Sequence, residues 1–299
     1  MLRPQRFDRE IDPGPVQIQA RSVHFATAGT DLDWIPGHPI ASHVVSLLNI
    51  LLPAGERWFI ETFNEALPLV KDPKLAEDMR GFIGQEGTHA ETHDIVMRDY
   101  LVNSGIDVTP MLNQVNYVFE KVLAPTASTD PKYRLNHLSE RLWFIAAVEH
   151  FTAVLGDFVL NCTWDDHHAD PTMTDLFRWH GAEEVEHRNV AYDVARYFHD
   201  SYFARIRIMP AVAFLMFMFF QRGMRFLVKA DPSLKLSWWQ MQRRRIRDTR
   251  LGLLPVYWNL VFRQSLEYCR PGYRPDSMGS TAQAVAYLAS SPAARAAHL

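Results

Sequence analysis

Two stretches of the chain decide its fold, FIGQEGTHAETH at residues 82–93 and WHGAEEVEH at residues 179–187. Each contains a Glu-x-x-His pattern, formed by Glu86 with His89 and by Glu184 with His187. Residues three apart on a helix lie on nearly the same face, so both side chains of each pair can turn toward one inward point. One such pair is common by chance, but two pairs on separate long helical segments indicate a metal site between helices.

Two further glutamates occur where a helical bundle would need them. Two divalent ions are neutralised by four carboxylates, and neutral imidazoles complete the coordination. Glu56 precedes Glu86 by a distance similar to that between Glu149 and Glu184, with a long crossover between the two halves. This order predicts a set of residues that bind two metal ions and carry the chemistry: Glu56, Glu86, His89, Glu149, Glu184 and His187.

Several neighbours compete for the same roles. His93 and His180 are each expected to be an additional ligand, with hydrogen bonding to a ligand as the alternative. Glu183 lies beside Glu184, but only Glu184 has the Glu-x-x-His spacing. Glu61 and Glu65 share the predicted helix of Glu56 and are alternatives to it. The alternative for the whole set is a solvated helical face with Glu/His pairs, which the apolar residues around the two motifs disfavour.

Other polar residues are left open by the sequence. Four of them either orient ligand imidazoles or face solvent: Gln85, Glu91, Glu186 and Asp193. The run DDHH at residues 165–168 has the composition of a second metal cluster. We interpret it as an exposed loop, because consecutive residues rarely converge on one ion.

The chain is predicted to be all-α, since no segment shows convincing strand alternation. A kink or a restart of the helix is expected just before Glu56, where Pro53 and Gly55 interrupt the pattern, and Asp72 is a predicted N-cap ahead of Pro73. Helices are expected at residues 42–67, 73–104, 110–123, 133–161, 171–198 and 206–228, with more helix to about residue 268.

The predicted architecture is an antiparallel four-helix bundle with additional C-terminal helices. We expect an irregular N-terminal arm at residues 1–40 and a single helical domain at residues 41–299. Within that domain, the bundle core covers about residues 41–200 and C-terminal helices cover about 201–270, and an irregular tail follows.

Composition excludes some classes of protein. The chain has 299 residues, 47% of them hydrophobic and 22% charged, with a formal net charge of −3 and no basic block typical of nucleic-acid binding. Cys162 and Cys269 lie far apart, which predicts neither a disulfide framework nor a zinc knuckle. The N-terminal stretch lacks an apolar signal region, so a cytoplasmic location is expected.

The apolar run Ile208–Phe220 is too short to span about 30 Å of hydrocarbon. It is expected to be a buried helix or, with the nearby tryptophans and arginines of residues 238–247, a helix that makes peripheral membrane contact. The Met- and Phe-rich stretch Phe214–Phe226 either packs in the core or lines an apolar substrate tunnel. A tunnel would imply a lipophilic substrate.

The motif order resembles that of the ferritin-like di-iron carboxylate superfamily. Four segments together resemble the bacterial family catalogued as predicted metal-dependent hydrolases: GERWF at 55–59, GQEGTHAETH at 84–93, VEHFT at 148–152 and WHGAEEVEH at 179–187. The ligand pattern also resembles that of p-aminobenzoate N-oxygenase, which has a histidine four residues before the last Glu-x-x-His glutamate, the position of His180. These resemblances imply two iron ions, with manganese, a mixed iron–manganese pair or, in a hydrolase, zinc as alternatives.

Three functions follow as hypotheses. The first is a di-iron oxygenase or oxidase that uses O2 on a small hydrophobic or aromatic substrate. Because the chain has neither a G-x-G-x-x-G motif nor a cysteine cluster, that enzyme would need an external electron donor or reductase. The second hypothesis is a di-metal hydrolase, and the third is a non-catalytic metal-binding bundle. A homodimer is compatible with all three.

Overall fold

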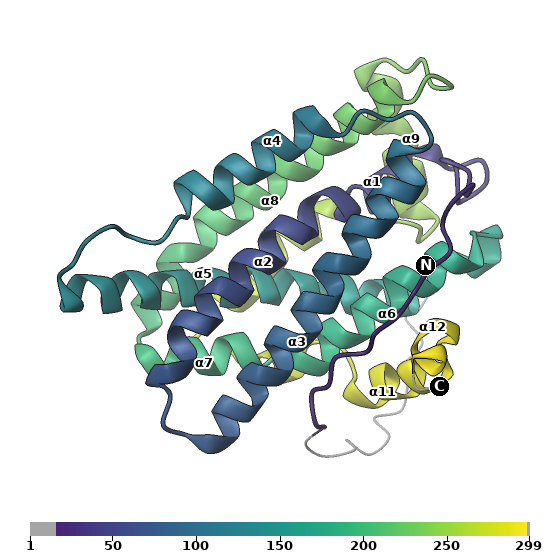
Figure 1. Cartoon of the computed structure of the whole chain (residues 1–299). Helices are drawn as coiled ribbons and strands as arrows, with labels where there is room; N and C mark the ends of the chain where they lie inside the picture. Colours follow the sequence, from purple (N-terminus) through teal and green to yellow (C-terminus); the bar gives the residue numbers. More distant parts are fainter. Residues whose placement is uncertain (1–15, 298–299) are drawn as a thin grey trace.

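Four long helices surround the centre of the molecule (Figure 1). Helix α2 packs against α3, helix α5 packs against α6, and the two pairs meet through contacts between α2 and α5 and between α3 and α6. The computed structural model describes residues 16–297, and those residues contain helices and no strand, which confirms the all-α prediction. The bounds of the four helices are Leu48–Ala66 for α2, Pro73–Val96 for α3, Pro131–Asn161 for α5 and Pro171–His187 for α6.

Three of the four long helices start with the same local device. Asp72, Asp130 and Asp170 are N-caps whose carboxylates accept backbone N–H groups of the first turn, and a proline follows each. The proline lacks the N–H that would be unsatisfied there, and its φ angle suits the first helical position. The predicted cap at Asp72 is therefore confirmed, and Gly105, with φ +87°, follows the end of the same segment as expected.

The structure corrects three expectations. Pro53 lies inside α2 without restarting it, because a proline in the second turn removes only one backbone hydrogen bond; the restart comes at Leu47, between α1 and α2. The predicted helix over residues 171–198 is divided into α6 and α7 (Val190–Phe198). The tail is not irregular, because it contains α11 (Thr281–Ser290) and α12 (Pro292–Ala296), which pack against α6.

Further helices cover one side of the bundle. Helix α8 packs against α5 and α1, α4 packs against α2, and Figure 1 shows α4 and α8 running alongside each other. Arg222 of α8 donates hydrogen bonds to Gln114 of α4, which joins these two helices. The remaining elements are α1 (Pro39–Ser46), η1 (Leu67–Leu69), η2 (Met97–Val102), α4 (Thr109–Tyr117), η3 (Val118–Val122), η4 (Asp165–His167), α8 (Tyr202–Ala230), α9 (Trp238–Arg250), η5 (Asn259–Arg263), α10 (Gln264–Tyr268) and η6 (Pro275–Ser277).

Two of these helices are long and apolar enough to cross a membrane, by length and composition alone. The most apolar window of α5 is 72% buried inside the protein, as expected for a core helix. The corresponding window of α8 is only 22% buried. The apolar helix predicted around residues 208–220 is thus present but largely uncovered on one side.

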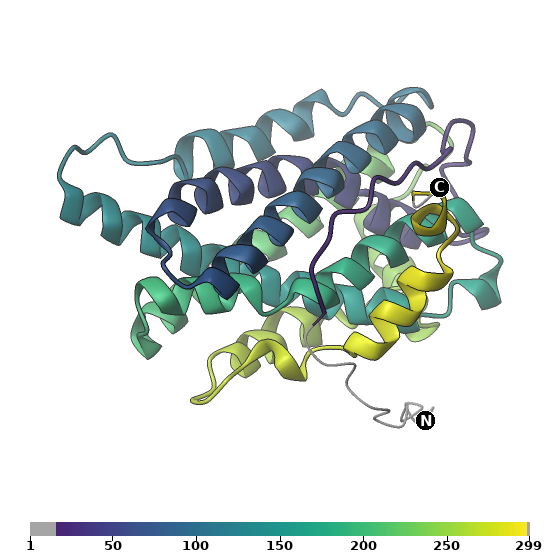
Figure 2. The same ribbon diagram turned by 60° about the horizontal axis from the view of Figure 1, so that its bottom comes forward.

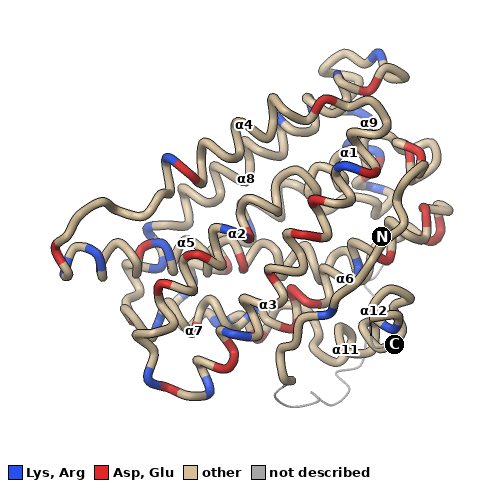
Figure 3. Tube along the Cα trace, viewed as in Figure 1, with Lys and Arg blue, Asp and Glu red and all other residues tan. Residues whose placement is uncertain are grey.

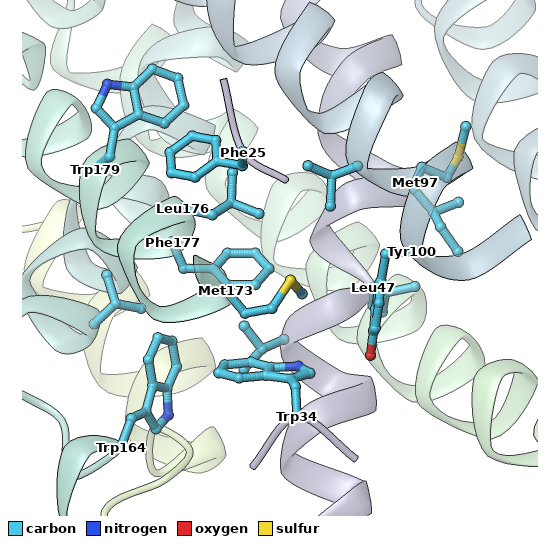
Figure 4. Close-up of a cluster of buried hydrophobic side chains, with 14 of the residues drawn as sticks. Phe25, Trp34, Leu47, Met97, Tyr100, Trp164, Met173, Leu176, Phe177 and Trp179 are labelled. Atoms are coloured by element: carbon cyan, nitrogen blue, oxygen red, sulfur yellow. The ribbon is translucent and has the colours of Figure 1, made fainter. Parts of the chain in front are cut away.

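The N-terminal arm is irregular from residue 16 to α1 and crosses the surface of α3 and α6 (Figure 2). Its first 15 residues lie outside the described part. A Cβ at Gly81 would overlap Ile18, so the glycine lets the arm lie directly on α3. Phe25 packs on Trp179, and Trp34 packs between Trp164 and Phe177 (Figure 4). These aromatic contacts hold the arm in one place.

Helices α5 and α6 approach closely next to the predicted site. A Cβ on Gly156 would overlap the carbonyl oxygen of Gly181, so only glycine allows this separation. Gly181 directly follows His180, and the close approach therefore brings the motif-bearing turns of α6 up to α5.

Candidate metal centre

The structure brings all six predicted ligands together in the middle of the bundle. Each is at most 3% exposed, and they come from all four helices. His187 Nε2 lies 3.2 Å from Glu149 Oε2 and 3.3 Å from Glu86 Oε1. His89 Nδ1 lies 3.7 Å from Glu184 Oε1. The ligand atoms thus face one another across distances that a metal ion could bridge.

His180 adds a seventh candidate ligand. Its Nε2 lies 2.9 Å from Glu184 Oε1 and 4.0 Å from Glu56 Oε1. Three groups have ligand atoms within 4.8 Å of one another: Glu86 with Glu149 and His187, Glu56 with His89 and His180, and Glu86 with His89 and Glu184. The first two groups share no residue, and the third contains one residue of each, so these residues would be able to hold two ions in adjoining sites.

Unsatisfied polar atoms test whether these residues suit metal ions. Among residues 16–297, both carboxylate oxygens of Glu56, Glu86 and Glu149 are buried without a hydrogen-bond partner, and so is Nδ1 of His89. A buried carboxylate without a partner is costly, and cations are the partners that would satisfy several at once. Carboxylate oxygen and imidazole nitrogen together suit iron, manganese and zinc. The residues present therefore fit a di-metal centre.

The electrostatics of the cluster lead to the same conclusion. Burial and the neighbouring carboxylates raise the pKa of Glu56 and Glu86 well above the usual range, and raise that of Glu149 to about 7. Against the effect of burial, His187 and His180 hold the pKa of Glu184 well below its usual value. The cluster contains more buried carboxylates than its neighbouring positive charges can stabilise in the ionised form. Bound cations would supply the missing positive charge.

A chain of hydrogen bonds orients each ligand histidine. His89 Nε2 lies 2.8 Å from Glu183 Oε2, so this carboxylate accepts the Nε2 proton and leaves Nδ1 free to face the centre. His187 Nδ1 lies 2.9 Å from Gln85 Oε1, which leaves Nε2 free in the same way. Gln85 in turn donates to Glu186 at 2.6 Å. Glu183 is thus a support for His89, and Glu184 is the residue that faces the centre.

The hydrogen-bond chains from His89 and from His187 both end at Arg21 of the N-terminal arm. Its guanidinium donates to Glu183 Oε1 at 2.6 Å and to the two oxygens of Glu186 at 3.0 and 3.1 Å. One arginine therefore connects the supports of His89 and His187. Arg21 was not predicted from the sequence, because it lies in an irregular segment far along the chain from its partners and belongs to no motif.

His93 occupies a position behind His180 and does not face the centre. Asn49 Nδ2 donates to the carbonyl of Ser46, so Asn49 Oδ1 accepts the Nδ1 proton of His93 at 2.7 Å. His93 Nε2 then accepts the Nδ1 proton of His180 at 2.8 Å, which directs His180 Nε2 toward Glu184. Both ring nitrogens of His93 are in use, so its prediction as a ligand does not fit this geometry. Asn49 was also missed, since an asparagine on an apolar helix carries no metal-site signal.

The remaining polar candidates lie away from the centre. Glu61 is exposed and Glu65 pairs with Arg141, which leaves Glu56 as the residue of α2 that faces the cluster. Glu91 is exposed, and Asp193 lies 3.8 Å from Arg274. The loop at 165–168 is largely exposed as expected, with Asp165 bound to Arg178.

An apolar cavity leads to the metal-facing side chains. Its volume is about 120 Å³, and it lies between α2, α5 and the covering helices α4 and α8. Leu215, Met216 and Phe219 of α8 line one wall, so the Met- and Phe-rich stretch lines a cavity and is not merely packed in the core. The wall facing the centre is formed by five of the candidate ligands: Glu56, Glu86, Glu149, His180 and Glu184.

The protein is therefore all-α in the described residues, with a buried cluster of candidate carboxylate and histidine metal ligands beside an apolar cavity. The chain belongs to the family described as predicted metal-dependent hydrolase, whose model matches residues 19–279. The matched range includes Arg21 and all seven candidate ligands. No curated protein and no solved structure matches the chain.

Proposed function

We propose that the protein is a di-iron enzyme that uses O2 to oxidise a lipophilic substrate held in the cavity. One observation carries the proposal: five candidate ligands form the end of a cavity whose other walls are almost entirely apolar. Such a pocket places a hydrocarbon or aromatic group beside the metal centre and keeps bulk water away from it.

When bound, iron ions supply the electron transfer to O2 that no side chain can provide. The chain itself holds the metal ions, orients the ligand side chains and excludes water from the site. Glu56, Glu86, Glu149 and Glu184 offset the charge of two divalent ions, and the imidazoles complete the set without adding charge. Burial lowers the pKa of His89 well below its usual value, which keeps its ring neutral and free to bind metal. The walls on α4 and α8 exclude water from the reacting group.

Hydrolysis is the second candidate, because the family is described as predicted metal-dependent hydrolases. Two metal ions can activate water, so the ligand set is compatible with it. The cavity lining favours oxidation: among the described residues that line it, Thr152 is the only polar side chain besides the ligands. An ester or amide would find almost no side chain there to bind its polar group or protonate its leaving group.

Metal reconstitution with matched variants tests the proposal. Metal-free protein is loaded anaerobically with Fe²⁺ or with Zn²⁺, and the O2 consumed per chain is measured after mixing with buffer that contains O2. The iron-loaded protein should consume O2 rapidly in an amount set by its two metal ions, and the zinc-loaded protein should consume none. Glu86→Ala should abolish the uptake, whereas Glu61→Ala, on an exposed site of α2, should not.

Two results would refute the oxygenase. Iron-loaded protein that does not react with O2, combined with anaerobic cleavage of lipophilic esters by the zinc-loaded form, would establish the hydrolase. Oxygen uptake that leads only to stored ferric ions, without any lipophilic compound accelerating it, would establish a metal-storage bundle. If the oxygenase is correct, continuous turnover should require an added reductase or chemical electron donor.

A further inference from the structure

The outer side of α8 and the segment after α9 carry many large exposed apolar side chains. The most exposed of these are Phe203, Leu266 and Trp258, at 75%, 71% and 67% exposure. Transfer of such large apolar side chains out of water is favourable, because it lowers the free energy of the system. We define the apolar face by its large exposed residues: Phe203, Phe214, Phe217, Val256, Trp258, Phe262 and Leu266.

These residues come from two segments that lie side by side in opposite directions. Helix α8 contacts both η5 and α10. The Tyr202 hydroxyl at the start of α8 donates to the carbonyl of Cys269, and the Tyr257 hydroxyl donates to the carbonyl of Phe217 further along α8. Trp258 and Phe262 stack with ring centroids 3.7 Å apart. The face is therefore a broad surface and not a set of isolated side chains.

The opposite side of α8 packs against the rest of the fold. Val212 and Phe220 are buried and line the cavity, and Arg205 is buried with its guanidinium donating to the carbonyls of Tyr268 and Arg270. Moving α8 across a bilayer would break these contacts and open the metal site. The helix can therefore meet a lipid surface only by lying flat on it.

Cationic side chains accompany the apolar face. Figure 3 shows a long stretch of α8 without charged residues, which corresponds to residues 208–220. Arg222 and Arg225 are exposed beyond its end, and within the described part of the chain Arg222 contacts the neutral Gln114 and no carboxylate. Arg263 is exposed within the neighbouring antiparallel segment. An apolar face with aromatic residues and accompanying arginines is complementary to a bilayer that carries anionic headgroups.

We propose that the apolar face docks the protein on the surface of an anionic lipid bilayer, with α8 parallel to the membrane plane. The same helix separates this face from the cavity, because Leu215 and Met216 point to the cavity and Phe214 and Phe217 are exposed. A lipophilic substrate would then pass from the bilayer to the metal centre along a single helix. This second step rests on the proposed function, whereas the docking does not.

Vesicle flotation with the full-length protein tests the docking. Vesicles of equal parts phosphatidylglycerol and phosphatidylcholine should carry the protein to the top of a density gradient, and pure phosphatidylcholine vesicles should carry much less. Each arginine near an anionic surface contributes about a fivefold increase in affinity, so Arg222→Glu with Arg225→Glu should weaken binding strongly. The triple variant Phe214→Ser, Trp258→Ser, Phe262→Ser should reduce binding by at least about tenfold.

A control variant removes exposed apolar residues from another part of the surface. Leu69 and Val102, at 50% and 43% exposure, lie on η1 and η2, and replacing both with serine should leave flotation unchanged. Wild-type protein that stays at the bottom with anionic vesicles would overturn the proposal. So would a stable dimer in sedimentation velocity that the triple variant abolishes, because the face would then belong to a second copy. Flotation needs neither metal nor turnover, so its failure is distinguishable from failure of the oxygenase proposal.

Discussion

Replacing Arg21 with alanine should weaken metal binding although Arg21 touches no metal-facing atom. The guanidinium is 14% exposed and holds Glu183, which is fully buried, and Glu186. Removing one partner of a buried ion pair costs about 3 to 5 kcal/mol, and the partial exposure of Arg21 places the effect at the lower end, about 3 kcal/mol of stability. Loss of the outer support of a metal-binding histidine lowers metal affinity by about 10- to 100-fold.

The pKa of Glu183 explains why the effect reaches the centre. Burial raises this pKa to about 7 even with Arg21 in place, so losing the guanidinium raises it further and favours the protonated carboxyl at neutral pH. A protonated Glu183 no longer draws the Nε2 proton of His89 toward itself. The imidazole tautomer that leaves Nδ1 free for metal then loses its support.

Competition between the protein and a chelator for Zn²⁺ measures the affinity, and thermal unfolding with and without Zn²⁺ separates it from stability. Arg21→Lys should give an intermediate affinity, because one ammonium cannot contact both carboxylates as the forked guanidinium does. Arg196→Ala, which breaks an exposed ion pair with Asp200, should change neither quantity much. An Arg21→Ala protein that is destabilised but binds Zn²⁺ as tightly as the wild type would refute the reasoning, since Arg21 would then only anchor the arm.

Three further predictions address other parts of the molecule. His93→Ala removes the acceptor of the His180 Nδ1 proton and should lower Zn²⁺ affinity by about tenfold in the same competition assay; an unchanged affinity would mean that His180 is oriented without it. Met216→Trp fills part of the cavity and should weaken binding of a fluorescent lipophilic probe, measured by titration, while Zn²⁺ affinity stays at the wild-type value; equal probe binding would show that the cavity is not the binding site. The hydrogen bond from His43 lowers the pKa of Asp231 from its ordinary 3.8 to about 2. The ionised carboxylate therefore stabilises the fold above about pH 4, and this stabilisation is lost as the pH falls to about 2. Asp231→Asn should therefore cost at most about 2 kcal/mol near neutral pH in denaturant unfolding, with a difference from wild type that shrinks below pH 4; a difference independent of pH would contradict this account.

Local patterns explain what could be predicted from the sequence. The spacing of Glu86 with His89 and of Glu184 with His187 is a property of any helix, so the metal-facing residues on α3 and α6 followed from two short motifs. The choice of Glu184 over Glu183 rested on the same spacing and agrees with the side chain that faces the centre. The helix start at Asp72 was equally predictable, because capping depends on a few adjacent residues.

Long-range contacts explain what could not. Arg21 reaches Glu183 across 162 positions of sequence, and Asn49 reaches His93 across 44. His93 lies one helical turn beyond His89, so its spacing suited a ligand, and only the packing of α2 and α6 around it assigns both ring nitrogens to other partners.

The helical class, the family resemblance and the six acidic and imidazole side chains that converge could all be predicted from residue types and from the order and spacing of motifs along the chain. The tertiary structure alone decided which side chains support the ligands, that α4 and α8 enclose an apolar cavity and that one side of α8 is left uncovered. These features depend on how separate segments pack together, and no spacing within a single segment encodes the distance between two of them.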